Sequence, residues 1–172
     1  MNDDRRAAPV EAPLTLLRAP VDPTWIDRND HVGIRGYAEA LARASGLLLG
    51  RLRLNFDQAY DEGSTIYSLR WHMAFAREVR AGANLRFTAQ LLDFNDRMFH
   101  ALLGMWNDDE NYLAASAEFL EAHVALATRR VAPMPADRLA LFEAMWATHK
   151  DLPWPKGAGE GIAVRGGRRE RG

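Results

Sequence analysis

The most regular pattern in the chain is a helical stripe that begins at Ile34. Its members recur at spacings of three and four residues, as one buried face of an α-helix requires. They are Ile34, Tyr37, Ala38, Leu41, Ser45 and Leu48. Frequent Gly and Ala residues between them make the helix slim, so that a broad element can wrap closely around it. The pattern predicts a helix over residues 34–50.

After residue 63 the period changes to two. Between residues 65 and 75 the odd positions from Tyr67 to Phe75 are apolar, whereas the even positions include Ser68, Arg70 and His72. This alternation predicts a strand. Further strands are predicted at residues 14–18, 84–91, 97–106 and 112–126, with turns at 93–96 and 107–111. Residues 52–63 are predicted to form a loop, with or without a helical turn.

The order of these elements predicts the fold class. A strand, a slim helix and a run of antiparallel strands suggest an α+β domain in which one sheet curls around one helix. A closing helix is expected after Pro135, with Asp137 as its cap. We expect residues 1–13 to be a flexible N-terminal segment, residues 14–150 to be the domain, and residues 151–172 to be a flexible tail rich in Gly and Arg.

Composition narrows the class of function. The 172 residues carry a net charge of −1, which gives no general attraction to nucleic acid or to anionic lipid. There is no cysteine, and the five histidines lack metal-ligand spacing, so we expect no disulfide, metal or cofactor. Neither a membrane-spanning run nor a signal peptide is evident, and a cytoplasmic location is the default expectation.

Candidate chemistry lies in the polar turn just before the central helix. Asp27 begins the stretch Asp27-Arg28-Asn29-Asp30-His31-Val32, which leads into the helix through Gly33. A carboxylate at this place can act on a carbon atom or on water while the free amides of the helix hold an oxyanion. The alternative is an acidic segment that only caps the helix.

These residues resemble the hotdog-fold thioesterases akin to 4-hydroxybenzoyl-CoA thioesterase. The pattern of that family before its central helix is Asp, two residues, Gly, then His or an apolar residue, and Val or Met. The preceding Val21-Asp22-Pro23-Thr24-Trp25-Ile26 also fits. Residues 69–79 with Gly82, the stretch 96–100 and the stretch 121–124 are similar to a subgroup that includes betainyl-CoA thioesterases. The resemblance covers residues 14–135.

The resemblance implies hydrolysis of an acyl-CoA. It makes Asp27 the nucleophile or the general base, and it makes the backbone amides near Ile34 and Arg35 the oxyanion donors. Candidate substrate-binding residues are Asn29, Asp30, His31, Tyr37, Arg70 and His72. It also implies a homodimer or a tetramer with active sites between subunits. Arg70 and His72 then either reach the site from the other subunit or face solvent.

Three positions depart from the family pattern. Asp30 stands where Gly is usual, and a side chain there either crowds the turn or demands an unusual backbone angle. Gly33 stands where Asn is frequent and offers no side-chain acceptor to cap the helix, and Arg70 stands where the subgroup often has Glu. These departures keep a second hypothesis open, in which a hotdog module binds an acyl-CoA or a small ligand without turnover.

A cationic acyl group suggests one further possibility. Trp25, Trp71 and Trp106 could together enclose a quaternary ammonium group in an aromatic box. Ordinary packing in the core is the alternative for each of the three rings.

Overall fold

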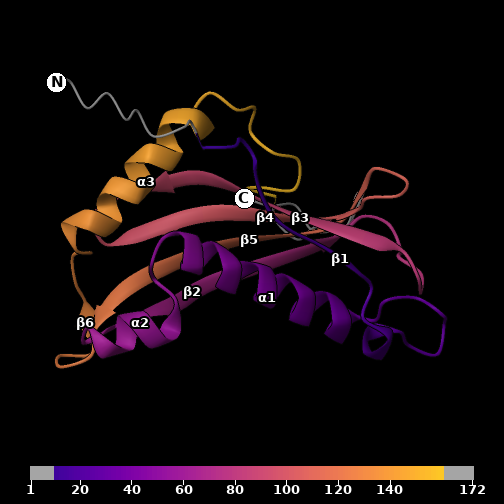
Figure 1. Cartoon of the computed structure of the whole chain (residues 1–172), viewed down its shortest axis with the longest axis horizontal. Coiled ribbons are helices and arrows are strands. Elements are labelled where there is room, and N and C mark those ends of the chain that lie inside the picture. Colours follow the sequence, from indigo (N-terminus) through magenta and orange to yellow (C-terminus); the bar gives the residue numbers. More distant parts are fainter. Residues whose placement is uncertain (1–9, 161–172) are drawn as a thin grey trace, which may run out of the picture.

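A computed structural model describes residues 10–160 of the chain (Figure 1). Its strands are β1 (Leu14–Pro20), β2 (Ser64–Phe75), β3 (Asn84–Phe94), β4 (Met98–Asn107), β5 (Tyr112–Ala125) and β6 (Arg130–Val131). Its helices are η1 (Pro23–Trp25, a 3₁₀ turn), α1 (Ile34–Arg51), α2 (Phe56–Asp61) and α3 (Ala136–His149). The predicted order of a strand, a long helix and an antiparallel sheet is confirmed.

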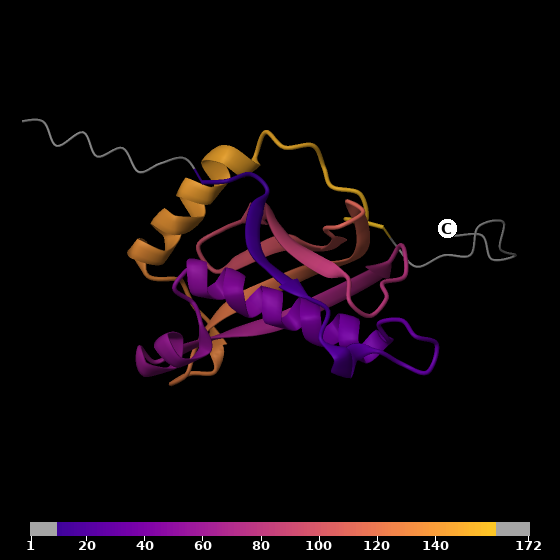
Figure 2. The same cartoon turned by 45° about the vertical axis from the view of Figure 1, so that its right-hand side comes forward.

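The strands form one antiparallel sheet in the order β1-β3-β4-β5-β2, with β6 paired to β5. The sheet curves around α1, which lies along its concave face, and α3 covers one end of it (Figures 1 and 2). Because β1 and β2 are the outer strands, each leaves one row of backbone groups without a partner strand within the described residues.

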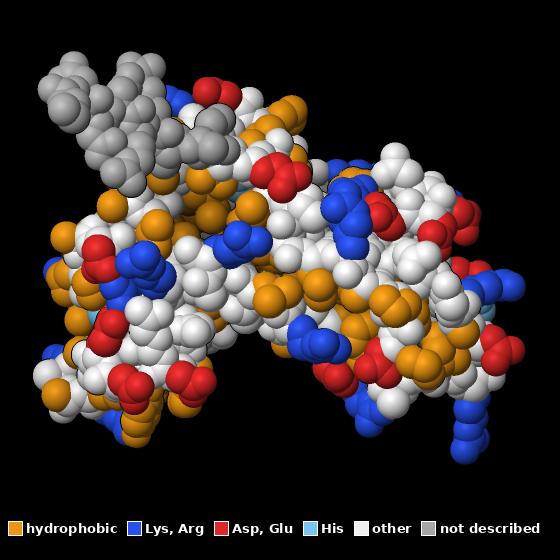
Figure 3. All heavy atoms as spheres, viewed as in Figure 1, with side chains coloured by type: hydrophobic (Ala, Val, Ile, Leu, Met, Phe, Trp, Pro, Cys, Tyr) orange, Lys and Arg blue, Asp and Glu red, His pale blue; other side chains and the backbone are white. Residues whose placement is uncertain are grey.

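The core lies between α1 and the concave face of the sheet. Leu41 and Leu48 of α1 are almost fully buried against apolar side chains from the middle strands. Those side chains include Phe87, Ala101, Leu103, Met105, Ala117 and Phe119. Gly36 is required for the close approach of α1 to η1, because a Cβ atom at Gly36 would stand 2.5 Å from Cβ of Trp25. Between α1 and β1 a cavity of about 320 Å³ remains, where hydrophobic atoms are visible in Figure 3.

Several boundaries differ from the predictions. Asp93 and Phe94, predicted as a turn, belong to β3, and β6 was not predicted. The loop at 52–63 contains α2, in agreement with the helical turn that was allowed there. Asp137 does not cap α3, because Pro135 occupies the N-cap position and Asp137 lies in the first turn.

The C-terminal segment departs from the picture of a tail without contacts. Pro153 accepts a hydrogen bond from Nε2 of Gln90 at 3.1 Å, and Ala158 is buried against Leu92 and Leu102. Residues 1–9 and 161–172 lie outside the described residues, so the predicted flexible ends stay a prediction there. In the part of the chain that is described, no helix has both the length and the apolarity to span a membrane.

Candidate active site

The loop before α1 is a tight turn closed at its base by a bridge between Ile26 and Val32. The amide of Asp27 donates to the carbonyl oxygen of His31 at 2.8 Å, and the amide of Asp30 donates to the carbonyl of Asp27 at 3.2 Å. This closure forces Asp30 into the left-handed region, with φ of 60°. Of the two consequences expected for a side chain at this position, the structure shows the unusual backbone angle, and Asp is one of the few residues that tolerate it.

The turn aims the carboxylate of Asp27 at the start of α1. Oδ1 of Asp27 accepts a hydrogen bond from the amide of Asn29 at 2.7 Å, which fixes the side chain. Oδ2 faces Gly33. A Cβ atom added to Gly33 would stand 3.3 Å from Oδ2 of Asp27. Oδ2 accepts no hydrogen bond from any described residue, and Asp27 is exposed. One carboxylate oxygen is therefore held and the other is available.

The helix start beside Asp27 has unused hydrogen-bond donors. Gly33 is the N-cap residue and provides no side-chain acceptor. The first amide of α1 with an acceptor inside the helix is that of Tyr37, which donates to the carbonyl of Gly33 at 3.1 Å. The amides of Ile34 and Arg35 come earlier and have no acceptor among the described residues. With the positive end of the helix dipole, they form a site for a partial negative charge.

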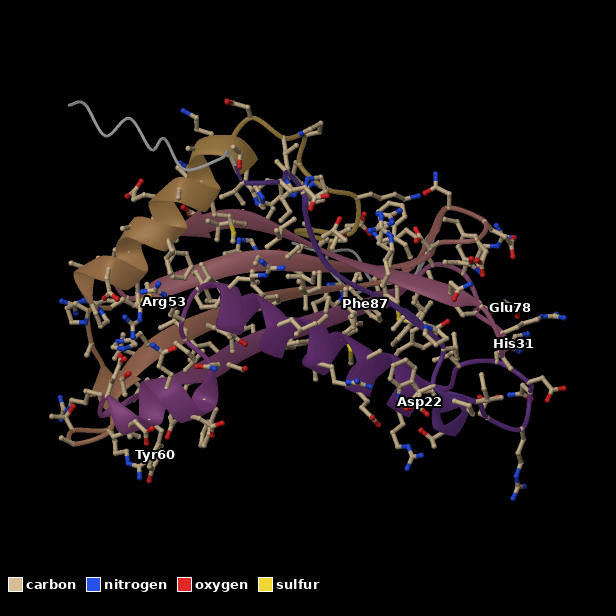
Figure 4. All side chains as sticks on the ribbon, in the orientation of Figure 1. Asp22, His31, Arg53, Tyr60, Glu78 and Phe87 are labelled. Atoms are coloured by element: carbon tan, nitrogen blue, oxygen red, sulfur yellow. The ribbon has the colours of Figure 1, made fainter. Side chains whose placement is uncertain are left out.

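His31 is held at the rim of the turn. Its Nε2 atom lies 3.1 Å from Oε1 of Glu78, and its backbone forms an isolated bridge with Arg80. Figure 4 shows His31 and Glu78 side by side at the end of the molecule where α1 begins. A polar cavity of about 440 Å³ lies at the same rim, lined among others by Arg77, Glu78 and Arg80. Sequence reasoning did not single out Glu78 as a site residue, although Glu78 lies in the stretch 69–79 that resembles the betainyl-CoA thioesterase subgroup.

Tyr37 connects the helix start to the outer strand β2. Its side chain is buried, its hydroxyl donates to the carbonyl of Arg77 at 3.3 Å, and burial raises the pKa of this hydroxyl. The ring packs against Phe75 with centroids 5.3 Å apart. Phe75 remains 49% exposed at the end of β2, so the Tyr37 side of the site opens toward an uncovered sheet edge. The sequence placed Phe75 at the end of the apolar series from Tyr67 to Phe75, but it did not predict the contact with Tyr37.

Arg70 and His72 are not brought to this site within one chain. They share one face of β2, as predicted, but His72 lies opposite Glu118 in the register of the sheet. Glu118 in turn lies opposite Leu102, which packs against Ala158 of the C-terminal segment rather than against α1. The pair therefore lies on the face of the sheet away from Asp27.

The three tryptophans do not form an aromatic box, and this hypothesis is wrong. Trp25 packs on α1 at Gly36. Trp71 stacks on Phe119, with ring centroids 5.1 Å apart, and Trp106 donates to the hydroxyl of Thr88 at 3.0 Å. Among residues 10–160, no group of three or more His, Asp or Glu side chains is arranged to hold a metal ion.

Comparisons with known proteins identify the family of this chain. The family model described as the thioesterase-like superfamily matches residues 21–142. The chain is 29% identical over 151 residues to a betainyl-CoA thioesterase of Pseudomonas aeruginosa, covering 88% of this chain and 95% of that protein.

Solved structures show the same fold. A Staphylococcus aureus protein in complex with CoA superposes with a TM-score of 0.82 at 18% identity, covering 91% of this chain and 99% of that one. A 1,4-dihydroxy-2-naphthoyl-CoA thioesterase from Synechocystis has a TM-score of 0.65 at 16% identity, covering 73% and 92%. The hotdog fold expected from the sequence is thereby confirmed.

Proposed function

Because the chain belongs to the thioesterase-like superfamily, we propose that it hydrolyses the thioester bond of an acyl-CoA at the start of α1. The observation that carries the proposal is the juxtaposition of Asp27 with the free amides of α1. Oδ2 of Asp27 is available on the side of Gly33, and the amides of Ile34 and Arg35 lie in the first turn of the same helix.

The chemistry follows from this juxtaposition. The carbonyl oxygen of the thioester accepts hydrogen bonds from the amides of Ile34 and Arg35, which stabilise the negative charge that develops in the transition state. Each such donor typically lowers the barrier by about 3 kcal/mol. Asp27 then acts in one of two ways. It either attacks the carbonyl carbon, releasing the CoA thiolate and leaving an anhydride that water hydrolyses, or it removes a proton from an attacking water.

The remaining residues of the turn position the substrate in this proposal. Asn29 holds Asp27 through its amide, and Asp30 and His31 shape the rim on which the acyl-CoA lies. Tyr37 and Phe75 supply an apolar wall for the acyl group. The betainyl ester on which the P. aeruginosa relative is named to act belongs among the first substrates to be tested.

The active form in our proposal is a homodimer joined along β2. This strand is an unpaired edge within the described residues, and Tyr67, Leu69 and Phe75 are all exposed by 45% or more. Two β2 strands related by a twofold axis run antiparallel, so the α1 start of one chain comes close to the α2 end of the other. In Figure 4 Tyr60, on α2, lies at the end of the molecule opposite His31.

This arrangement gives the partner a role in the site. Phe56 and Tyr60 stack with centroids 5.6 Å apart, and they are 68% and 53% exposed. Tyr60 of the partner subunit would complete the wall that Tyr37 and Phe75 begin. Further association of two dimers into a tetramer is compatible with the same pairing.

A thiol-release assay tests the proposal. The full chain is incubated with betainyl, short-chain and aromatic CoA esters, and free CoA is measured with a thiol reagent. Release from at least one ester above the uncatalysed rate is expected.

The alternative function is a binding module without turnover, favoured by the departures at Asp30, Gly33 and Arg70. It predicts that an acyl-CoA raises the melting temperature while no ester in the panel releases thiol. That combined result would reject hydrolysis and keep the binding module.

A further inference from the structure

The face of the sheet away from α1 carries a further cavity, of about 660 Å³. Arg70 and His72, which the proposed active site leaves unused, lie in its wall together with side chains from three neighbouring strands. The polar and charged residues that line it are Arg70, His72, Asp93, His100, Glu118 and Glu160. The C-terminal segment, which lies across the sheet from α1 in Figure 2, contributes Gly159 and Glu160.

The register of the sheet arranges these side chains in a row. Arg70 of β2 lies opposite Leu120 of β5, Leu120 lies opposite His100 of β4, and His100 lies opposite Asp93 of β3. Residues directly opposite one another point to the same face. Neighbouring strands lie about 4.8 Å apart, so the backbone positions of Arg70 and Asp93 are separated by roughly 14 Å.

In the middle of the cavity, His100 of this row bonds to Glu118, which lies two residues before Leu120 on β5. Nε2 of His100 lies 2.7 Å from Oε1 of Glu118, and the other oxygen of Glu118 accepts the amide hydrogen of Gly159 at 2.8 Å. The two ends differ from the middle. Among the described residues, neither Arg70 nor Asp93 has an ion-pair partner, although both side chains are exposed beside the cavity.

The cavity thus has a guanidinium at its β2 end and a carboxylate at its β3 end, and Glu160 adds a second carboxylate from the C-terminal segment. A ligand with a single charge would form an ion pair with Arg70 or with Asp93 and would leave the other side chain without a partner. We propose that this cavity binds an elongated zwitterion, in which an apolar stem separates a carboxylate from an ammonium group. The carboxylate pairs with the Arg70 guanidinium, the stem lies over Leu120, and the ammonium group faces Asp93.

His72 and the C-terminal segment complete the site. His72 lies beside Arg70 on the same face of β2 and adds a hydrogen-bond donor at the carboxylate end. Residues 159–160 form one wall and are held there through Glu118. This site lies on the opposite face from Asp27, so the inference does not rest on the proposed thioester hydrolysis.

Calorimetric titration of the full chain with 6-aminohexanoate tests the inference. Hexanoate and hexylamine serve as matched probes, because each keeps the stem and only one of the charges. We expect 6-aminohexanoate to bind at least about tenfold more tightly than either of them, which corresponds to about 1.4 kcal/mol for the second ion pair. Glycine, a zwitterion without a stem, is expected to bind more weakly than 6-aminohexanoate.

Variants assign the binding to this cavity. Arg70→Gln and Asp93→Asn should each weaken the binding of 6-aminohexanoate about tenfold. Arg51→Gln and Asp57→Asn change exposed charges outside the cavity and should leave the affinity for 6-aminohexanoate unchanged. Circular dichroism confirms that each variant is folded. Absent binding of 6-aminohexanoate, equal binding of hexanoate or hexylamine, or unchanged affinity in the folded Arg70 and Asp93 variants would each overturn the inference.

Discussion

Asp27 and Gly33 are packed so closely that a methyl group at Gly33 would stand 3.2 Å from Cβ of Asp27 and 3.3 Å from its Oδ2. Such contacts are tighter than ordinary van der Waals distances. The absence of a side chain at Gly33 therefore leaves room for the carboxylate beside the free amides of α1. The Gly at position 33, which departs from the family pattern, is therefore part of the candidate site.

The first prediction concerns this contact. Gly33→Ala should displace the Asp27 carboxylate and lower kcat/KM by about tenfold, because small misplacements of a reacting group are costly. Steady-state kinetics on the ester that the thiol-release assay identifies measures the effect. Gly46→Ala is the matched control, since nothing lies within 4 Å of its added Cβ, and activity there should be unchanged. Equal activity of the Gly33 variant and the parent protein would contradict the positioning role.

Removing the charge of Asp27 should have a larger effect. Asp27→Asn is expected to lower kcat/KM by at least about 100-fold, because neither the nucleophile nor the general base remains. Glu143→Gln, an exposed change on α3, serves as the control in the same assay. If the Asp27 variant kept most of the activity, the chemistry would have to be assigned to other residues.

Asp30 should be replaceable by glycine with a gain in stability. Its φ of 60° is a left-handed conformation that costs an L-residue about 1 kcal/mol, and Gly adopts it without that cost. Asp30→Gly should therefore raise the free energy of unfolding by about 1 kcal/mol in urea denaturation. Asp30→Ala keeps the Cβ atom and should show no such gain, so equal effects of both variants would argue against backbone strain.

The edge of the sheet should control assembly. Leu69→Lys places a charge at an exposed position of β2, and light scattering should then show a lower molecular mass than for the parent protein. Because the proposed site is completed by the partner, hydrolysis should fall as well. Val131→Lys, at a similarly exposed position of β6, should leave the mass unchanged. A parent protein that is already monomeric would exclude the dimer.

His149 should make the fold sensitive to acid. The ring is buried, its Nδ1 accepts the amide hydrogen of Leu91 at 2.9 Å, and its Nε2 donates to the carbonyl of Glu11 at 3.0 Å. Burial lowers the pKa of His149 below 6.5, the value for the unfolded chain. The unfolded state then binds the extra proton, so the stability contribution is present above pH 6.5 and is lost as the pH falls through the folded pKa.

The measurement is the slope of the melting temperature between pH 7.5 and pH 5, compared between the parent chain and His149→Gln. Although the variant is expected to be less stable throughout, its slope should be smaller. Burial raises the pKa of the Glu121 carboxyl, so Glu121 makes the protein less stable as the pH rises. This contribution is the same in the parent chain and in the variant. Parallel slopes would show that His149 does not titrate across unfolding.

Much of the fold was predictable because it depends on local pattern. The apolar stripe of α1 and the alternation in β2 both show which face of the element is apolar. This property depends only on residues that are close together in the sequence. The unusual conformation of Asp30 was one of two consequences expected from the family resemblance, because Gly is usual at this position of the turn. The prediction that Asp137 caps the closing helix was wrong because Pro135 occupies the N-cap position. Which residue is the cap depends on where the first turn of the helix begins.

The sequence by itself determined which residues alternate, which form a helix, and that Asp27 stands just before that helix. Only the tertiary structure decided that Arg70 and His72 face away from α1, that Phe75 lies against Tyr37, and that residues 153–158 pack on the sheet. The physical reason is that periodicity specifies two faces without saying what covers each. That depends on segments that are distant in the chain and meet only after the sheet has curled around the helix.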